Sequence, residues 1–589
     1  MPIPQAFLRA ITITFAAVIA TAAAAQPHKA KAAPAVAHPI EHDLLEIDIP
    51  HLQDLYRAHK YSVTDVVNWY LARIRGYNGV YGALEDIDAK GALETAARED
   101  AEFKTSGPSA IDGALWGVPI VIKENTSIKG LITSDGWKGY VLPGHELVAP
   151  RDATIVAHLR AAGAVILGKT NMPDFAASDT NRSTAFGRTG NAYDVRFSPG
   201  GSSGGTVTAV TANMAMLGNG TDTGNSIRMP AATSAVVGVF PTRGLVSTAG
   251  IAPLDWLLDN TGPIARNVTD AAIALTVMAG SPASPDPLDA RTAESKEAQP
   301  GPYTQYLKPD ALKGKRFGVP AFILAGAGIP FQGIPADESP DQAARDRASA
   351  VIPLQPETRA AFMKAVEALR AAGATVVFDE SILPDSFADT VSRVGTLPYL
   401  REGTENFLAH YGPAQYHSAG EYERAVGHPL PPTIIGGGKP GTLSVDPRPV
   451  VQQQQFEGNP QAEADVLAPR RRALEQYDQT LDRMHLDGYV YPAIQMPPPD
   501  ETMPQDGEIS GGPHSDTSWV NMIGVPAVVV PAGFYANGLP FGLEISARRW
   551  HDGDLLGWAY AFEQATHLRR PPVLVEKGLT RVVSAREER

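Results

Sequence analysis

The sequence predicts an α/β fold in which helices cover a largely buried β-sheet. The first observation is that a helical pattern followed by a short strand recurs along the chain, at 152–162 and 164–167, at 360–372 and 375–378, and at 471–484 and 488–491. The second is that the strand segments are short runs rich in β-branched residues. Such alternation is typical of an α/β sandwich with a buried sheet.

The N-terminal part of this domain is predicted to be helical, with apolar residues at helical spacing in 52–75 and 89–103. From Trp116 the pattern changes, and Val118–Ile122 is a buried strand candidate between Gly117 and Lys123.

Two further helices are expected before the middle of the chain. Residues 152–162 form an amphipathic pattern with Asp152 as the candidate N-cap, and Gly163 ends it. Residues 206–217 are rich in Ala and Val and predict a buried helix.

Composition bounds the function of this 589-residue chain. The net charge of −14 argues against a nucleic-acid partner, since phosphate binding needs an excess of Lys and Arg. The absence of cysteine excludes disulfides, thiol nucleophiles and thiolate metal sites. No cofactor and no metal cluster is expected.

The N-terminus predicts an exported protein. Residues 1–25 combine a positive charge, a short apolar run and an Ala-rich cleavage site, as in a signal peptide. The alternative is an uncleaved membrane anchor. After cleavage no stable membrane insertion is expected, because no other stretch reaches the ~20 apolar residues of a membrane helix. The mature protein is then expected in the periplasm of a Gram-negative source and otherwise secreted.

The remaining organisation is a single domain with appendages. Residues 26–44 are predicted to be a flexible leader, 45–575 the domain, and 576–589 a C-terminal tail. Insertions are expected near 324–357 and 428–465, which are rich in Pro, Gly, Gln and Asp.

Two short motifs match known patterns and fail on context. Residues 163–170 fit the G-x-x-x-x-G-K-T phosphate-binding loop, but their middle predicts a strand, and Pro173 limits any following helix. Residues 200–204 fit the G-x-S-x-G nucleophile elbow, which needs a strand just before it. Pro199 makes 196–199 a poor strand, and the candidate histidines, His514 and His551, have no telling context.

Three other segments carry the chemistry: GVPIVIKEN at 117–125, SPGGSSGG at 198–205 and GTDTGNSIRMP at 220–230. The glycine-rich segments let backbone N–H groups approach a ligand, as an oxyanion hole requires. Both run directly into apolar stretches, which argues against surface linkers. Lys123 ends an apolar run, so burial should lower its pKa, although a surface lysine is the alternative.

These segments resemble the amidase signature family of serine hydrolases. The resemblance extends to AAGAVILGKTNM at 161–172, LGNGTDTGNSIRMPAA at 217–232 and GVPAVVVPAGF at 524–534. It implies an α/β/α sandwich with a large mixed central sheet, covered by helices on both faces. It also implies hydrolysis of a small-molecule amide to a carboxylate and an amine or ammonia.

The resemblance assigns roles to nine residues. Ser226 resembles the nucleophile, Ser202 a bridging serine held by a cis peptide bond from Gly201, and Lys123 the base. The resemblance places the oxyanion hole at the N–H groups of Thr223, Gly224, Asn225 and Ser226. Asp222 and Arg228 are expected to brace this turn.

The chain departs from the family pattern at Glu124, usually Asp, at Asn225, usually Gly, and at Phe240, often Lys. Asn tolerates left-handed backbone better than most residues, so the hole can survive the change at position 225.

Three alternatives remain beside an exported amidase. One is an α/β-hydrolase esterase using Ser202, and another is a catalytically silent binding protein on the same fold. The third is a glutamine amidohydrolase subunit that feeds ammonia to aminoacyl-tRNA, which the export signal disfavours. The acyl group and the oligomeric state are not readable from the sequence.

Overall fold

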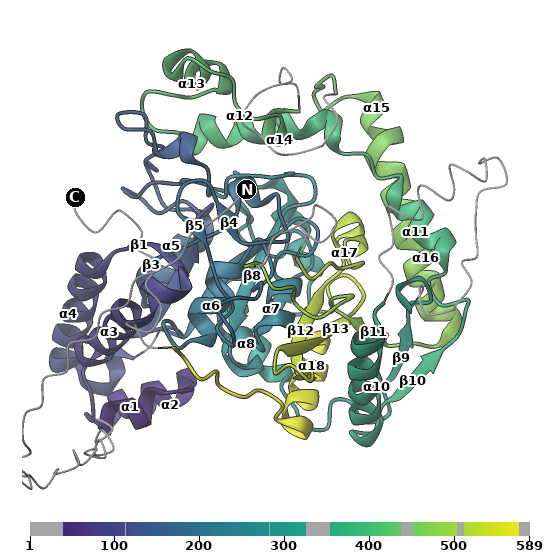
Figure 1. The fold of residues 1–589 in the computed structure, drawn as a ribbon, viewed down its shortest axis with the longest axis horizontal. Helices are drawn as coiled ribbons and strands as arrows, with labels where there is room; N and C mark the ends of the chain where they lie inside the picture. The colour runs from purple at the N-terminus through teal and green to yellow at the C-terminus, as the bar shows by residue number, and fades with distance from the viewer. Residues whose placement is uncertain are drawn as a thin grey trace, which may run out of the picture.

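The computed structural model describes residues 39–111, 113–281, 283–324, 354–436, 451–502 and 512–575. An 11-stranded sheet runs through the molecule (Figure 1). Its strands, in spatial order, are β1 (Leu84–Ile87), β3 (Ala164–Thr170), β2 (Val118–Lys123), β6 (Leu217–Asp222), β8 (Asn260–Ala265), β7 (Val237–Phe240), β12 (Ala527–Phe534), β13 (Pro540–Ser546), β11 (Gly488–Pro492), β9 (Arg316–Val319) and β10 (Thr375–Phe378).

The sheet is mixed. β2 pairs in parallel with both β3 and β6, and β9 pairs in parallel with β10 and β11. The strands between these groups are antiparallel. The predicted α/β class and the large mixed central sheet are therefore confirmed. A short hairpin, β4 (Arg182–Ser183) with β5 (Gly187–Arg188), lies outside the sheet.

Helices pack on both faces of the sheet. Tyr491 and Glu544 are cross-strand partners, so their side chains share one face. On this face lie α7 (Arg228–Thr233), α11 (Asp385–Ser392), α16 (Ala468–Met484) and α17 (Trp519–Ile523). The face of Val490 packs with α10 (Pro356–Ala371) and α18 (Asp552–Thr566).

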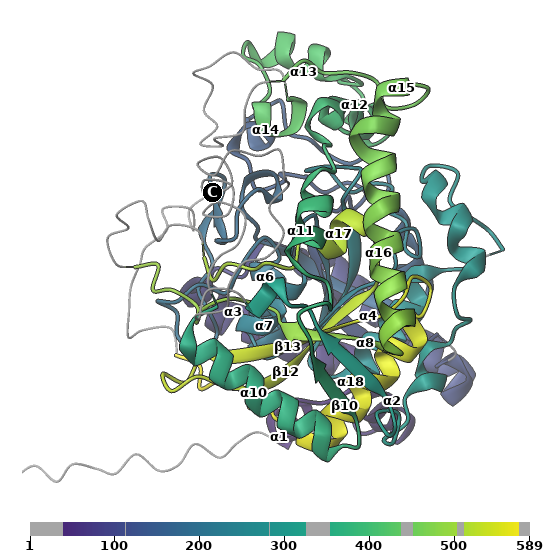
Figure 2. The ribbon, with the colours of Figure 1, turned by 90° about the vertical axis from the view of Figure 1, so that its right-hand side faces the viewer.

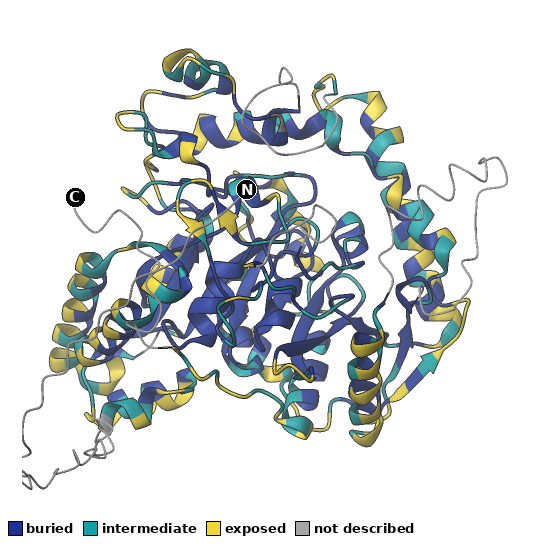
Figure 3. Ribbon diagram, in the orientation of Figure 1, coloured by how far each residue is buried: buried dark blue, intermediate teal, exposed yellow. Residues whose placement is uncertain are grey.

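The other helices complete the sandwich. They are α1 (Pro39–Leu44), α2 (Ile49–Arg57), α3 (Val63–Tyr81), α4 (Ala89–Ser106), α5 (Thr154–Ala161), α6 (Gly204–Thr211), α8 (Val268–Ala279), α12 (Leu400–Tyr411), α13 (Ala419–Val426), α14 (Pro432–Ile435) and α15 (Pro460–Ala462). α12–α14 lie above the sheet as a separate layer (Figures 1 and 2). The central strands are buried along their length, whereas α4, α10 and α13 expose one side (Figure 3).

Local contacts explain where the predicted helices differ. The helix expected over 52–75 is broken into α2 and α3, because Ser62 and Asp65 form a reciprocal capping box that starts a new helix. α5 begins after Ala153 instead of Asp152. The Asp152 carboxylate accepts the Lys129 N–H at 2.8 Å and pairs with Arg160.

The helix expected over 206–217 ends early. α6 stops at Thr211, and Asn213 takes left-handed backbone with φ of 54°. Leu217, predicted to end the helix, begins strand β6 instead. The chain turns there because β6 pairs with both β2 and β8.

The predicted appendages are described only in part. Residues 1–38 and 576–589 lie outside the described residues, as do 325–353 and 437–450 within the two expected insertions. Residues 39–44, expected in the flexible leader, form α1 instead, with Leu44 fully buried. The second insertion contains α14, α15 and a π-helical turn over Glu463–Leu467.

Candidate active site

Lys123 is the last residue of β2, between two parallel neighbours of the sheet. Its side chain is fully buried, and its backbone N–H donates to Asn219 Oδ1 at 2.9 Å. Asn219 lies on β6, so the adjacent strand fixes the backbone that carries the lysine. The lysine is therefore held by the centre of the fold and not by a loop.

The amine of Lys123 lies among hydroxyl groups. Its Nζ is 2.7 Å from Ser202 Oγ, 3.0 Å from Ser203 Oγ and 3.3 Å from the Thr221 carbonyl oxygen. Burial lowers the pKa of Lys123 to about 7, while Asp222, Asp135 and Asp259 oppose that shift. Near neutral pH a large fraction of the amine is therefore unprotonated and able to accept a proton.

Ser202 is held in a tight turn that leads into α6. The peptide bond between Gly201 and Ser202 is cis, as the family resemblance implies, and Gly200 has a φ of +74°. At Gly201, a Cβ atom would lie 2.5 Å from the Ser178 carbonyl oxygen. Only glycine fits there, so this turn packs directly against the backbone of 178–180.

Ser226 lies in the turn between β6 and α7. Its side chain is 5% exposed, and its hydroxyl has no hydrogen-bond partner among the described residues. The Ser203 N–H donates to the Ser226 carbonyl oxygen at 3.2 Å, which ties the two serine-bearing turns together. The predicted nucleophile and the Lys123–Ser202 pair thus belong to one continuous cluster.

The predicted oxyanion-hole residues form the same turn. No described residue accepts a hydrogen bond from the backbone N–H groups of Thr223, Gly224, Asn225 or Ser226. Gly224 faces open space, since the nearest atom to a Cβ there would be Ser518 Cβ at 3.9 Å. A row of free N–H groups beside a serine hydroxyl is suited to a developing oxyanion.

Asp222 and Arg228 brace this turn, as expected from the sequence. Asp222 Oδ2 accepts the Ile227 N–H at 2.9 Å and Arg228 Nε at 3.1 Å. Arg228 Nη2 donates to the Gly224 carbonyl oxygen at 2.7 Å. Both ends of the turn are therefore tied to one buried ion pair.

Arg228 continues this network into the C-terminal part of the chain. Its Nη1 donates to Glu544 Oε1 at 2.7 Å and to Thr517 Oγ1 at 2.7 Å, and its Nη2 donates to Asn521 Oδ1 at 2.5 Å. Burial favours loss of its charge, but Asp222 and Glu544 outweigh this and raise the pKa of Arg228. Phe240, a departure from the family pattern, lies 5.3 Å from the guanidinium through its ring.

Glu124, another departure, is paired away from Ser226. Its Oε1 accepts the Ser134 N–H at 2.8 Å and lies 3.2 Å from Lys169 Nζ. Lys169 also donates to the Ile132 carbonyl oxygen. Since Lys169 is buried within strand β3, the G-x-x-x-x-G-K-T match is not a phosphate-binding loop.

The nucleophile-elbow pattern at Gly200–Gly204 also lacks its context. Residues 198–200 before Ser202 form no strand, and the hydrogen bond of Ser202 is made to Lys123. His551 instead hydrogen-bonds Asp554 at 3.1 Å on the surface of α18. The geometry does not support an esterase triad at Ser202.

Several polar residues near the turn carry no local sequence signal. Asp259 accepts the Thr223 hydroxyl at 2.5 Å, and Asp135 has a buried Oδ1 without a hydrogen-bond partner. Asn521 and Glu544 meet Arg228 from positions about 300 residues away in sequence. Asn219 was the exception, because it belongs to the same motif as Ser226.

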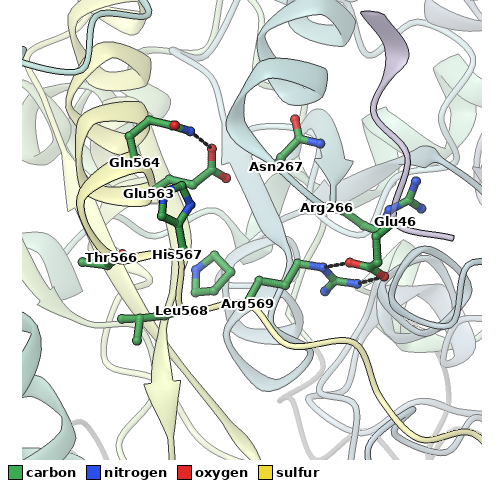
Figure 4. A pocket seen from close by; sticks show the side chains of 10 residues that line it. Glu46, Arg266, Asn267, Glu563, Gln564, Thr566, His567, Leu568 and Arg569 are labelled. Atoms are coloured by element: carbon green, nitrogen blue, oxygen red, sulfur yellow. Dashed lines mark hydrogen bonds and ion pairs between the residues drawn. The ribbon is translucent and has the colours of Figure 1, made fainter. Parts of the chain in front are cut away.

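Two cavities lie near these elements. One of about 330 Å³ adjoins Asp259 and is walled by Trp256, Arg291 and Phe407. The other, of about 250 Å³, lies between the end of α18 and Glu46 (Figure 4) and contains none of the predicted site residues. There Glu46 and Arg569 pair at 2.7 Å, so the charges of the second cavity largely satisfy each other.

Membrane spans and metal centres leave recognisable patterns in a structure. Within the described residues no helix has both the length and the apolar character needed to cross a membrane. The same part of the chain contains no group of three His, Asp or Glu side chains that could hold a metal ion.

Comparison with known proteins identifies the family of folds and sequences that this chain resembles. The model of the Amidase family matches residues 65–328 and 342–556. A glutamyl-tRNA(Gln) amidotransferase subunit of Symbiobacterium thermophilum is 32% identical over 546 residues, covering 90% of this chain and 98% of that protein.

Solved structures agree. Native peptide amidase from Stenotrophomonas maltophilia is 29% identical with a TM-score of 0.67, covering 90% of this chain and 99% of that chain. An amidase family protein from Bacillus anthracis is 26% identical with a TM-score of 0.66, covering 90% of this chain and 93% of that chain.

These relatives correct one prediction. The curated relatives are named as subunits of an amidotransferase for glutamyl-tRNA(Gln), which is an enzyme of translation and not an exported hydrolase. The prediction that this chain is exported is therefore wrong. The short apolar run that suggested a signal peptide lies within residues 1–25, outside the described residues.

Proposed function

Since the chain belongs to the Amidase family, we propose that it hydrolyses carboxylic amides through an acyl-enzyme formed on Ser226. The chain is an amidase that acts on C–N bonds, and the proposal concerns which residues perform the chemistry. The observation that carries it is the 2.7 Å contact between Lys123 Nζ and Ser202 Oγ in a fully buried setting. A neutral lysine against a serine is a base in position, and no histidine is needed.

In the proposed reaction, Ser226 Oγ attacks the amide carbonyl carbon. Its proton passes to Ser202 as the Ser202 proton passes to Lys123. The tetrahedral oxyanion is held by the N–H groups of Thr223, Gly224, Asn225 and Ser226. The proton then returns through the same relay to the leaving nitrogen, and the C–N bond breaks to release an amine or ammonia.

Water completes the cycle. The Ser202–Lys123 relay takes a proton from water as the oxygen attacks the acyl-enzyme, and Ser226 leaves with the returned proton. The balance is one amide and one water converted to one carboxylic acid, which ionises, and one amine. Asp222 and Arg228 support this proposal by fixing both ends of the oxyanion turn.

The test is covalent labelling with a fluorophosphonate probe, followed by mass spectrometry. We expect the adduct on Ser226 and its loss in Ser226→Ala. An adduct on Ser202 would favour the nucleophile-elbow alternative. A wild-type protein that binds amides without turnover would favour the silent binding protein. Activity is assayed on a panel of primary amides, anilides and peptide amides.

The curated relatives support a second candidate, the glutamine amidohydrolase subunit. The ground for disfavouring it was the predicted export, which the comparisons overturn. L-glutamine therefore belongs in the panel, with and without glutamyl-tRNA(Gln). Glutamine turnover well above that of the other primary amides would favour this candidate, and hydrolysis of peptide amides in preference to glutamine would exclude it.

A further inference from the structure

The backbone of residues 178–180 is pressed against the serine-bearing turn. At Gly201 a Cβ atom would lie 2.5 Å from the Ser178 carbonyl oxygen, 2.7 Å from that of Thr180 and 2.9 Å from the Asp179 carbonyl carbon. The following residue, Asn181, accepts the Gly204 N–H at 3.1 Å. The segment that carries Asp179 is thus fixed beside the catalytic turn on both sides of the cis bond.

Asp179 meets the residue that precedes the nucleophile. The side chain of Asn225, which replaces the usual glycine of the family pattern, hydrogen-bonds the Asp179 carboxyl group. Asn225 is 9% exposed, and Asp179 is partly buried. Burial raises the pKa of Asp179 to about 7, although the bond from Asn225 opposes this. A cation beside Asp179 would stabilise its ionised form.

The surroundings of the turn are acidic and short of free cations. Asp222, Asp135 and Asp259 all act electrostatically on Lys123. Arg228 is matched by Asp222 and Glu544, and Lys169 by Glu124. Asp135 also has an unpartnered Oδ1 although its side chain is only 2% exposed. A substrate carboxylate would meet repulsion here, whereas a substrate cation would supply the missing partner.

We propose that Asp179, held in place by Asn225, is a specificity-determining residue that selects amides whose acyl group carries a protonated amine or a guanidinium. The same carboxylate disfavours acyl groups that end in a carboxylate. This inference rests on the proposed function, because it places the acyl group beside Ser226. It explains the departure from glycine at position 225 as a hydrogen-bond donor to Asp179.

The experiment compares three amides of similar length: pentanamide, 5-aminopentanamide and glutaramate. Values of kcat/KM are measured for the wild type and for Asp179→Asn, which keeps the shape and removes the charge. The wild type is expected to prefer the cationic amide to the neutral one. In Asp179→Asn this preference should fall about 10- to 100-fold, and the relative rate on glutaramate should rise.

Asp194→Asn is the matched control, because Asp194 is a surface carboxylate paired with Arg196. It should leave the order of the three substrates unchanged. Equal wild-type preference for all three amides, or the same substrate ratios in Asp179→Asn and wild type, would overturn the inference. These ratios are compared only with Ser226-dependent activity, so a failure of the proposed nucleophile appears separately, as turnover that survives Ser226→Ala. Circular dichroism of each variant identifies loss of fold, in which case Asp179→Ser provides the same ratio test.

Discussion

At the scale of single residues, Lys123 shows how burial converts an ordinary side chain into a base. A solvated lysine titrates near roughly 10.4 and is almost fully protonated at neutral pH. Here the surrounding sheet strips water from the amine and lowers its pKa to about 7. The nearby aspartates counteract this, so the observed shift is a balance in which burial dominates.

The first prediction is a pH profile. Protonated Lys123 cannot accept a proton, so activity should be low below pH 7 and should rise as pH increases through about 7. Lys123→Ala should lower kcat by about 100- to 10,000-fold, the usual range for general base catalysis. Lys123→Arg should not restore activity, since a guanidinium stays protonated. The measurement is kcat on a neutral amide from pH 5 to 10; a flat profile or an active Lys123→Arg would contradict the mechanism.

The second prediction separates two adjacent serines. Ser202 and Ser203 both lie within 3.0 Å of Lys123 Nζ, but the Ser203 hydroxyl also bonds the Thr221 carbonyl oxygen. We expect Ser202→Ala to lower kcat about 100-fold or more, because the relay is broken. Ser203→Ala should cost about tenfold or less, the loss of one neutral hydrogen bond. Steady-state kinetics on one primary amide decides this, and the opposite order would make Ser203 the relay.

At the scale of elements, the oxyanion turn depends on a buried ion pair that crosses the chain. Arg228 begins α7 and reaches both Asp222 at the end of β6 and Glu544 on β13. All three side chains are fully buried. Burying these charges costs solvation, so the pair is not expected to add much stability by itself. Its contribution is to fix the turn that carries Ser226.

The third prediction follows from leaving those carboxylates unpaired. Arg228→Met should lower the free energy of unfolding by about 3–5 kcal/mol, because Asp222 and Glu544 would keep no cationic partner. Arg57→Met is the control, since the Arg57–Asp54 pair is on the surface and should contribute about 1 kcal/mol or less. Urea unfolding measures both. The double variant Arg228→Met with Glu544→Gln should recover part of the loss, and no recovery would argue against this cause.

The sequence predicted what is local and missed what is assembled. Lys123, Ser202 and Ser226 were found because each lies in its own glycine-rich or apolar motif. Strands β2, β3, β10 and β11 were predicted by their apolar runs. Asn521 and Glu544 could not be predicted, since they meet Arg228 only after the sheet has formed. The break between α2 and α3 was missed because Ser62 and Asp65 form a cap inside an otherwise continuous helical period.

At the scale of the whole molecule, α12–α14 form a layer that is joined to the sheet by aromatic packing (Figures 1 and 2). Trp137, Tyr140 and Phe175 come from the loops beside the core, and Tyr416 and Tyr422 come from this layer. Tyr422 is fully buried, with its ring 5.4 Å from Tyr140 and 5.5 Å from Tyr416. Trp137 is 3% exposed, so it serves packing.

The fourth prediction tests how this layer is held. Tyr422→Ala removes the central ring of the contact and its hydrogen bond to the Gly139 carbonyl oxygen, so it should cost about 3–5 kcal/mol, as large aromatic truncations do. Because the layer lies outside the sheet, we expect the loss to appear as local opening. Hydrogen exchange should accelerate over 400–435 while β6 keeps its protection. Phe186→Ala, at a ring that is 40% exposed, should cost about 1 kcal/mol or less. Equal acceleration over 400–435 and in β6 would mean that the layer and the sheet unfold as one unit, with the aromatic contact stabilising both.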